Sequence, residues 1–549
     1  MTSRRAVCLA LALAAAAAVA GCERRGDVRE PTAAPARPRL VVLIVIDQLP
    51  SWSFERDAAH LRGGIARLLR EGAVWWRAQY PYATTNTGPG HATLGTGVPP
   101  SQHGIVANRW FEHGAKIEVA DDPDSLRLDV AGGAPRPGGA SARRLTAPGL
   151  AEALHAAWPQ ARAVTLAWKS RAAVLVAGQH PDLALWFDAE QAAMTTSTSY
   201  RETVPPWLAA LARTHGKDAL LQPWSIVDRE RLEAIAPGGD EQPGEADPEA
   251  LGARFPHVPR STKALAFVTA ADTLLVDAAI AAIDGESLGR DDAPDLLALS
   301  FSPHDYAGHA WCQESWERAE HLLTIDRELV RLLDHLDAQL GHDGYAVVFT
   351  SDHGALPSRA LAAAAGRPSR LWLTTELEAL AQRAAAEVLG EGTWVDGANT
   401  TALTLSASLH AHPQRDVAID RVATRLREAG LAWVQRTDTV PADCGAADDL
   451  AALVCRSIAP DHGGDLYLVA PEHDLLNDED GECTAHGSPW RYDREVPVII
   501  RAPGLRAATQ SSVPSMLQLA PTIAALLGVA PPPRADAAPL PGVGAASAP

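Results

Sequence analysis

The side chains best suited to chemistry in this sequence are aspartates and histidines that follow apolar segments or lie one helical turn apart. Asp305 and His309 are four residues apart, so a helix would place both on one face, as metal ligands require. The other members of the set are Asp47, Asp352, His353 and His486. Such ligands suit Zn²⁺, and two groups of them predict a site for two Zn²⁺ ions. Taken singly, each residue fits a helix cap or a solvated side chain better.

A second segment of interest is TTNTGPGHA at 84–92. Its glycines allow close approach of the backbone to a ligand, and its proline favours the first turn of a helix. A hydroxyl at a helix N-terminus beside metal ions can be deprotonated and act as a nucleophile. On its own the segment would be a turn with a capping threonine. Its glycine spacing matches neither a dinucleotide-binding loop nor an NTPase phosphate loop.

These residues need a scaffold, and four short apolar runs predict it. The continuously apolar run at 40–46 is typical of a strand buried on both faces of a parallel sheet, and mostly apolar runs at 163–167, 296–301 and 345–350 repeat the pattern. Each run ends at polar residues, and ligands of open α/β sheets bind beyond the carboxyl ends of strands. The sequence therefore predicts an α/β fold with a largely parallel central sheet, helices on both faces and one composite site.

Other segments complete the predicted organisation. Leucines and isoleucines spaced three and four apart predict a packing helix over 317–340, with Asp326 in solvent. We expect a catalytic domain over 39–360, a cap-like insertion over 361–480, a closing catalytic part over 481–530 and a disordered tail over 531–549.

The N-terminus has the pattern of an export signal. Arg4 and Arg5 precede an apolar run at 6–20, and the residues before Cys22 resemble a bacterial lipobox. We expect a signal peptide over 1–21, a lipidated tether over 22–38 and an outer-membrane anchor facing the periplasm. Ordinary secretion with cleavage nearby is the alternative.

The charge of the chain excludes one class of partner. The 549 residues carry a formal charge of −19, which argues against nucleic acid as a stable partner because such binding needs a basic surface. Lysine is scarce, with only Lys116, Lys169, Lys217 and Lys263. A lysine inside a motif is therefore more informative than usual.

Together the motifs resemble the alkaline phosphatase superfamily, in particular its phosphate-irrepressible, phosphodiesterase-like branch of periplasmic alkaline phosphatases. The matching segments are VIDQ at 45–48, TGPGHA at 87–92, HGIVANRW at 103–110, KSR at 169–171, DYAGH at 305–309, TSDHG at 350–354, HGSP at 486–489 and LAPTIAALLG at 519–528. Their order and number make the resemblance far more specific than any single motif.

The resemblance implies a role for each matching residue. Asp305, His309 and His486 would hold one zinc ion. Asp47, Asp352 and His353 would hold the other, with Thr87 bound there as the nucleophile. Asn108, Lys169 and Arg171 would bind the phosphoryl group. The implied activity is hydrolysis of small phosphate monoesters through a phospho-threonine intermediate.

Three other functions are considered as alternatives. A phosphodiesterase or nucleotide pyrophosphatase could use the same scaffold, although Lys169 and Arg171 suit the second negative charge of a monoester. A sulfatase is disfavoured, because the chain has no Cys/Ser-x-Pro-x-Arg motif. A catalytically inactive metal-binding lipoprotein would not need a nucleophile, metals and a phosphate clamp together.

The cysteines allow two disulfides. Cys312 lies three residues after His309 and Cys483 three residues before His486, so we expect a Cys312–Cys483 bond that pins two metal ligands together. Cys444 and Cys455 could close a short loop. Unrelated buried thiols are the alternative.

Overall fold

The computed structural model describes residues 37–112, 114–367, 369–459 and 462–543. The predicted signal peptide, the lipidated Cys22 and most of the tether lie outside these residues. In the described part of the chain no helix is long and apolar enough to cross a membrane.

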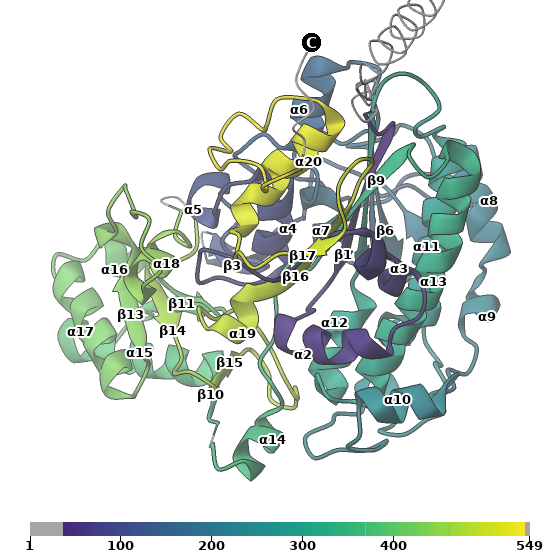
Figure 1. The fold of residues 1–549 in the computed structure, drawn as a ribbon. Coiled ribbons are helices and arrows are strands. Elements are labelled where there is room, and N and C mark those ends of the chain that lie inside the picture. The colour runs from purple at the N-terminus through teal and green to yellow at the C-terminus, as the bar shows by residue number, and fades with distance from the viewer. Residues whose placement is uncertain (1–36, 113, 368, 460–461, 544–549) are drawn as a thin grey trace, which may run out of the picture.

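A nine-stranded sheet forms the centre of the molecule (Figure 1). Its strands, in spatial order, are β17 (Ala508–Thr509), β2 (Ala73–Gln79), β16 (Glu495–Arg501), β9 (Tyr345–Thr350), β1 (Leu40–Ile46), β8 (Asp295–Phe301), β5 (Ala163–Ala167), β6 (Leu183–Asp188) and β7 (Ala193–Thr195). The five strands from β9 to β6 are parallel, whereas β16 and β7 run antiparallel to their neighbours. The predicted largely parallel sheet is confirmed.

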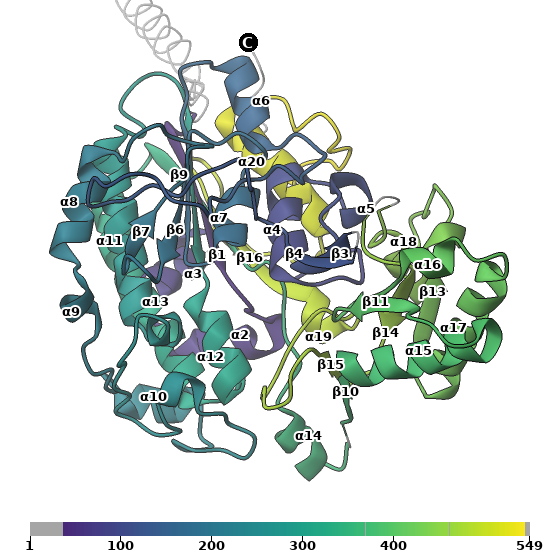
Figure 2. The same cartoon turned by 180° about the vertical axis from the view of Figure 1, so that it is seen from behind.

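Helices cover both faces of this sheet (Figures 1 and 2). Alternate residues of β1 join two different apolar cores, which is why the whole strand is apolar. One core includes α3 (Gly64–Glu71), α8 (Pro206–Thr214), α10 (Arg229–Ile235), α11 (Ala270–Gly285) and α13 (Trp316–Leu340). The opposite face carries α4 (Thr87–Thr96), α6 (Leu150–Ala157), α7 (Ser170–Leu175) and α20 (Leu519–Leu527).

A smaller lobe with its own apolar core lies beside the sheet, in green in Figure 1. Its antiparallel sheet contains β11 (Val395–Ala398), β12 (Ala402–Leu405), β14 (Leu466–Val469) and β13 (Trp433–Arg436). Packed on it are α15 (Thr374–Leu389) and α17 (Arg415–Glu428), and β10 (Leu371–Leu373) pairs with β15 (Leu475–Asn477). The predicted cap-like insertion over 361–480 falls on this lobe.

The remaining helices and strands are short. They are α2 (Ser51–Asp57), α5 (Pro100–His103), β3 (Arg109–Glu112), β4 (Ala115–Glu118), α9 (Lys217–Leu220), α12 (Pro303–Trp311), α14 (Arg359–Ala364), α16 (Ala407–His410), α18 (Leu450–Cys455) and α19 (Arg491–Arg494). The β3–β4 hairpin contacts the smaller lobe, where the Asn399 side chain donates to the carbonyl of Arg109 at 2.9 Å.

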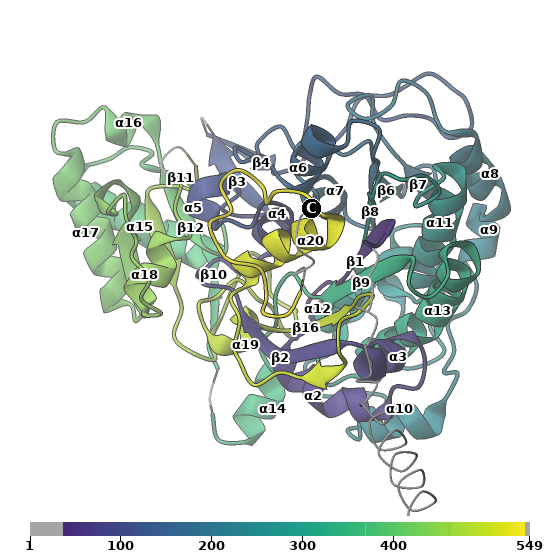
Figure 3. The same ribbon diagram turned by 45° about the horizontal axis from the view of Figure 1, so that its top comes forward.

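Two expectations for the scaffold were wrong. The tail is not disordered over 531–543, because Leu540 and Val543 are buried in the core that contains α20. The backbone N–H of Leu540 also donates to Oγ1 of Thr522, a residue of α20, at 2.8 Å. Helix α20 lies beside α4 and α6 (Figure 3). Asp326 is not in solvent either: it is fully buried and accepts four backbone N–H bonds at the start of α3.

Candidate active site

The register of the central strands brings the predicted site residues to one edge of the sheet. Ile46 of β1 lies opposite Phe301 of β8, and Val45 lies opposite Thr350 of β9. Asp47 follows β1 directly, and six further candidates follow the ends of β5, β8 and β9. Those residues are Lys169 and Arg171 at the start of α7, Asp305 and His309 on α12, and Asp352 and His353 after β9. The predicted composite site therefore lies where expected.

Asp47, Asp352 and His353 form the first group that fits a metal ion. One ligand atom from each lies within 4.8 Å of the others, and all three side chains are fully buried. Within the described residues, Asp47 Oδ1, Asp352 Oδ2 and His353 Nε2 have no hydrogen-bond partner, and His353 Nε2 is 3.4 Å from each of the two oxygens. Three buried polar atoms without partners that point at one another would be costly unless a cation lies between them. This donor set fits Zn²⁺.

A second group surrounds Asp305. Its carboxylate lies with His353 and His486 in one cluster of possible metal ligands, and Asp305 Oδ1 is 3.2 Å from His309 Nε2. The rings of His353 and His486 stack with centroids 3.7 Å apart. The predicted second set, Asp305, His309 and His486, is therefore brought together, and His353 lies between the two groups.

Hydrogen bonds orient all three histidines in the same way. The Nδ1 atoms of His353, His486 and His309 lie 2.8–3.0 Å from the carbonyl oxygens of Gly354, Thr85 and Thr484, respectively. Because a carbonyl oxygen can only accept, Nδ1 carries the proton and Nε2 keeps the lone pair that a metal needs. Burial lowers the pKa of His353 to about 3, which keeps the ring neutral.

Thr87 is the first residue of α4 and is fully buried among these groups. The backbone N–H of Gly88 donates to Asn108 Oδ1 at 2.7 Å, which fixes the Asn108 side chain beside Thr87. A Cβ on Gly90 would lie 2.3 Å from the carbonyl oxygen of Asp352, so only glycine lets α4 approach the metal-binding group this closely.

Lys169 lies between the carboxylates of Asp47 and Asp305. Its Nζ is 2.7 Å from Asp47 Oδ2, contacts Asp305 Oδ2 and is 3.5 Å from Thr87 Oγ1. Burial would lower the pKa of Lys169, but the charges of Asp305 and Asp47 raise it above its ordinary value, so the ammonium stays charged. Arg171 lines the adjoining cleft, and its buried Nε has no hydrogen-bond partner in the described part of the chain. One cation, Lys169, therefore lies close to Thr87, and a second, Arg171, lines the adjoining cleft.

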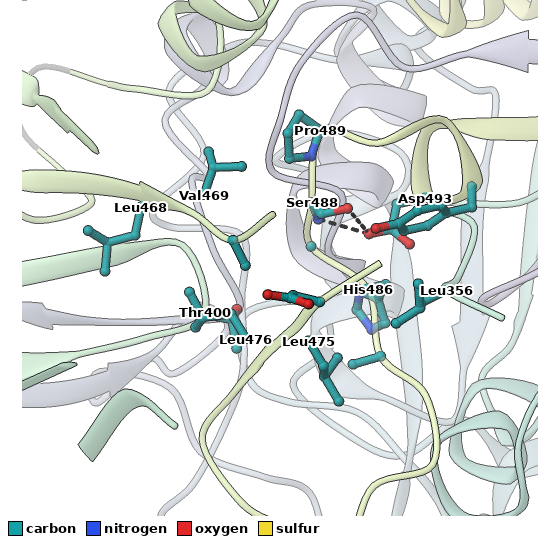
Figure 4. Close-up of a pocket in the computed structure, with 15 residues that line it drawn as sticks. Leu356, Thr400, Leu468, Val469, Leu475, Leu476, His486, Ser488, Pro489 and Asp493 are labelled. Carbon is teal, nitrogen blue, oxygen red and sulfur yellow. Dashed lines mark hydrogen bonds between the residues drawn. The ribbon is translucent and has the colours of Figure 1, made fainter. Parts of the chain in front are cut away.

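The cleft over these residues has a cavity volume of about 270 Å³. Asn108, Arg109 and Arg171 line one side, and Asn399 and Asn477 of the smaller lobe line the other. An adjoining pocket, lined by the side chains in Figure 4, lies between His486 and the smaller lobe. At about 20 Å³ it holds little more than one water molecule. Of these two cavities, only the larger has room for a small-molecule ligand.

Three residues around the ligands were not predicted. His91 Nδ1 is 3.2 Å from Asp352 Oδ2, Gln48 Nε2 donates to Asp305 Oδ1 at 2.7 Å, and Glu482 Oε2 is 3.0 Å from His309 Nδ1. His91 and Gln48 lie inside motifs that had drawn attention, so proximity to a ligand was an available signal. Glu482 gave no signal except its place next to Cys483.

Both predicted disulfides are confirmed. Cys312 and Cys483 are bonded with their Cα atoms 5.0 Å apart, and Cys444 and Cys455 are bonded with theirs 5.5 Å apart. Since Cys312 follows His309 by three residues, the first bond ties α12 to the loop that carries His486.

Comparison with known proteins supplies the family context. Residues 41–473 match the family described as "Type I phosphodiesterase / nucleotide pyrophosphatase". The chain is 29% identical over 524 residues to "Alkaline phosphatase PhoK" of Sphingomonas sp, covering 89% of this chain and 88% of that protein. It is 26% identical over 522 residues to "Alkaline phosphatase PafA" of Elizabethkingia meningoseptica, covering 91% and 93%.

A solved structure confirms the fold. The crystal structure of wild-type alkaline phosphatase PafA superposes with a TM-score of 0.84 at 24% identity, covering 92% of this chain and 99% of that one. Nearly the whole described chain, including the smaller lobe, therefore has a counterpart in one known architecture.

Proposed function

The chain belongs to the type I phosphodiesterase / nucleotide pyrophosphatase family within the alkaline phosphatase superfamily and is a phosphatase, and we propose that it hydrolyses phosphate monoesters with two Zn²⁺ ions and Thr87 as nucleophile. The observation that carries the proposal is the position of Lys169 and Arg171. Lys169 Nζ is 3.5 Å from Thr87 Oγ1, and Arg171 lines the same cleft. A monoester carries one more negative charge than a diester, and these two cations suit it.

Two sets of residues would hold the metal ions. One ion would lie among Asp47, Asp352 and His353, and the other among Asp305, His309 and His486. When bound, the ions would lower the pKa of the Thr87 hydroxyl and stabilise negative charge on the departing oxygen.

The chain's own residues account for the remaining chemistry. Thr87 Oγ1 attacks phosphorus as the ester P–O bond breaks, which leaves a phospho-threonine and releases the alcohol. Water then breaks the Oγ1–P bond and releases inorganic phosphate, and two such displacements retain the configuration at phosphorus. The side-chain amide of Asn108, the ammonium of Lys169 and the guanidinium of Arg171 face the phosphoryl oxygens and balance their charge.

A comparison of two substrates tests this proposal. The zinc-loaded chain from residue 23 onward is assayed with an aryl phosphate monoester and the matching diester. We expect a higher kcat/KM on the monoester. A higher kcat/KM on the diester would overturn the assignment and favour the second candidate, a phosphodiesterase, to which the family's own description points.

We also propose that the protein is exported and anchored to the outer membrane through a lipid on Cys22. The sequence around Gly21 and Cys22 supports this, and two disulfides suit an oxidising compartment. Replacement of Cys22 by serine should move the enzyme from the membrane fraction to the soluble fraction. Retention of the Cys22→Ser variant in the membrane would contradict the proposal.

A further inference from the structure

One of the three histidine ligands differs from the others in its hydrogen bonding. Among the described residues, the Nδ1 atoms of His353 and His486 form hydrogen bonds only with backbone carbonyl oxygens. His309 Nδ1, in contrast, lies 3.0 Å from the carboxylate oxygen Glu482 Oε2 as well as 3.0 Å from the carbonyl of Thr484. A carboxylate that accepts the Nδ1 proton pushes electron density toward Nε2 and makes the ring a stronger metal ligand.

One hydrogen bond holds the Glu482 carboxylate, and another holds the backbone of the next residue. The Asn477 side chain donates to Glu482 Oε2 at 2.8 Å, and the backbone N–H of Cys483 donates to the carbonyl of His309 at 2.8 Å. The Cys312–Cys483 disulfide then ties the next residue of the loop to the end of α12. The carboxylate thus has a fixed place beside the ligand.

This arrangement links the smaller lobe to the metal site. Asn477 is the last residue of β15, which pairs with β10, and Glu482 follows five residues later on the same loop. Neither residue belongs to the central sheet that positions the metal ligands after β1, β8 and β9. The loop therefore brings a second, independent support to His309.

We propose that Glu482 is a positioning residue for the metal ligand His309 and that the Cys312–Cys483 disulfide keeps Glu482 in place. Loss of the Glu482 carboxylate or of the disulfide then speeds release of one of the two metal ions. This inference rests on the proposed two-metal function. Loss of such a carboxylate weakens metal binding by about 10- to 100-fold. Because the Thr484 carbonyl still accepts from His309 Nδ1, ring orientation survives and the effect of Glu482→Gln falls near the lower end.

The test measures metal release from the full zinc-loaded enzyme to a chromophoric chelator. We expect Glu482→Gln to release one ion about tenfold faster than the wild type, with the second ion unchanged. Asp480→Asn is the matched control, because this variant removes the same charge from the same loop. Asp480 is exposed, and within the described residues its side chain accepts a hydrogen bond only from the backbone N–H of Gly481. Release from Glu482→Gln at the wild-type rate would overturn the inference.

A second pair of variants tests the disulfide. Replacing Cys312 and Cys483 together by serine should speed release of the same ion, whereas replacing Cys444 and Cys455 should not. Equal release rates from both double variants would remove the disulfide from the proposal.

Two further measurements separate this inference from the proposed function and from a folding defect. Excess zinc should restore the kcat of Glu482→Gln on a monoester, which a misfolded protein would not show. A wild type that binds no zinc would overturn both proposals. A wild type that binds two ions while Glu482→Gln retains them equally well would overturn only the role of Glu482.

Discussion

Replacing Lys169 by alanine is the sharpest test of how this site recognises the charge of its substrate. The ammonium is buried and lies 3.5 Å from Thr87 Oγ1, the atom that we propose receives the phosphoryl group. A phosphoryl oxygen on that atom would therefore lie within contact distance of Lys169. The variant removes this positive charge but leaves Thr87 and every predicted metal ligand in place.

The expected loss follows from the charge difference between substrates. A hydrogen bond to a charged group contributes about 1.5–3 kcal/mol, which corresponds to a loss of roughly 10- to 150-fold in kcat/KM. The monoester presents two negative charges on its phosphoryl oxygens and the diester one. We therefore expect most of the loss on the monoester and less than about threefold on the matching diester.

The assay compares kcat/KM for both esters in the wild type, Lys169→Ala and Lys217→Ala. Lys217 is an exposed lysine, so Lys217→Ala controls for removal of a charge without a contact to the site. The zinc content of each protein is measured, because Lys169 also contacts Asp47 and Asp305. An equal loss on monoester and diester, at unchanged zinc content, would refute the reasoning.

Three further predictions concern metal dependence and stability. Removal of metal with a chelator should abolish monoester hydrolysis and added Zn²⁺ should restore it; activity that persists in metal-free protein would contradict the metal site. Burial and the nearby charge of Glu317 raise the pKa of Glu245 to about 8, so between pH 5 and 8 the folded state keeps a proton that the unfolded state has lost, and folding stability falls as pH rises through this range. Glu245→Gln should therefore be more stable than the wild type at pH 8 and nearly equal at pH 5 in urea unfolding, and an equal difference at both values would refute this. Asp326→Ala should lower the free energy of unfolding by about 3 kcal/mol, because it removes the acceptor of four buried backbone N–H groups; a change below about 0.5 kcal/mol in the same urea experiment would contradict this.

The central sheet could be predicted closely because its strands are buried on both faces. Three of the four predicted strands, at 40–46, 163–167 and 345–350, have the observed bounds, and the fourth begins one residue earlier, at Asp295. Polar residues directly after such strands must meet at one edge, so the composite site followed from the same pattern.

Contacts between distant segments could not be predicted in this way. The helix around Asp326 was correct, but its carboxylate accepts from backbone groups more than 250 residues earlier in the chain. Glu482 contacts His309 across 173 residues. The strands of the smaller lobe are three or four residues long, and most of them pair across long connections, so the local pattern was too short to predict their order.

The tail shows a different reason for failure. Its proline- and alanine-rich composition is typical of disorder, yet Leu540 and Val543 suffice to anchor it in the core beside α20. Composition averages over a segment, whereas two well-placed apolar side chains decide its packing.

The central claim, that Thr87 takes the phosphoryl group from a monoester, is tested most directly by Thr87→Ala. The kcat/KM on an aryl phosphate is measured in a variant shown to retain two zinc ions per chain. We predict a loss of at least roughly 1,000-fold, since the variant lacks the attacking oxygen. A kcat/KM within about tenfold of the wild type would contradict the account.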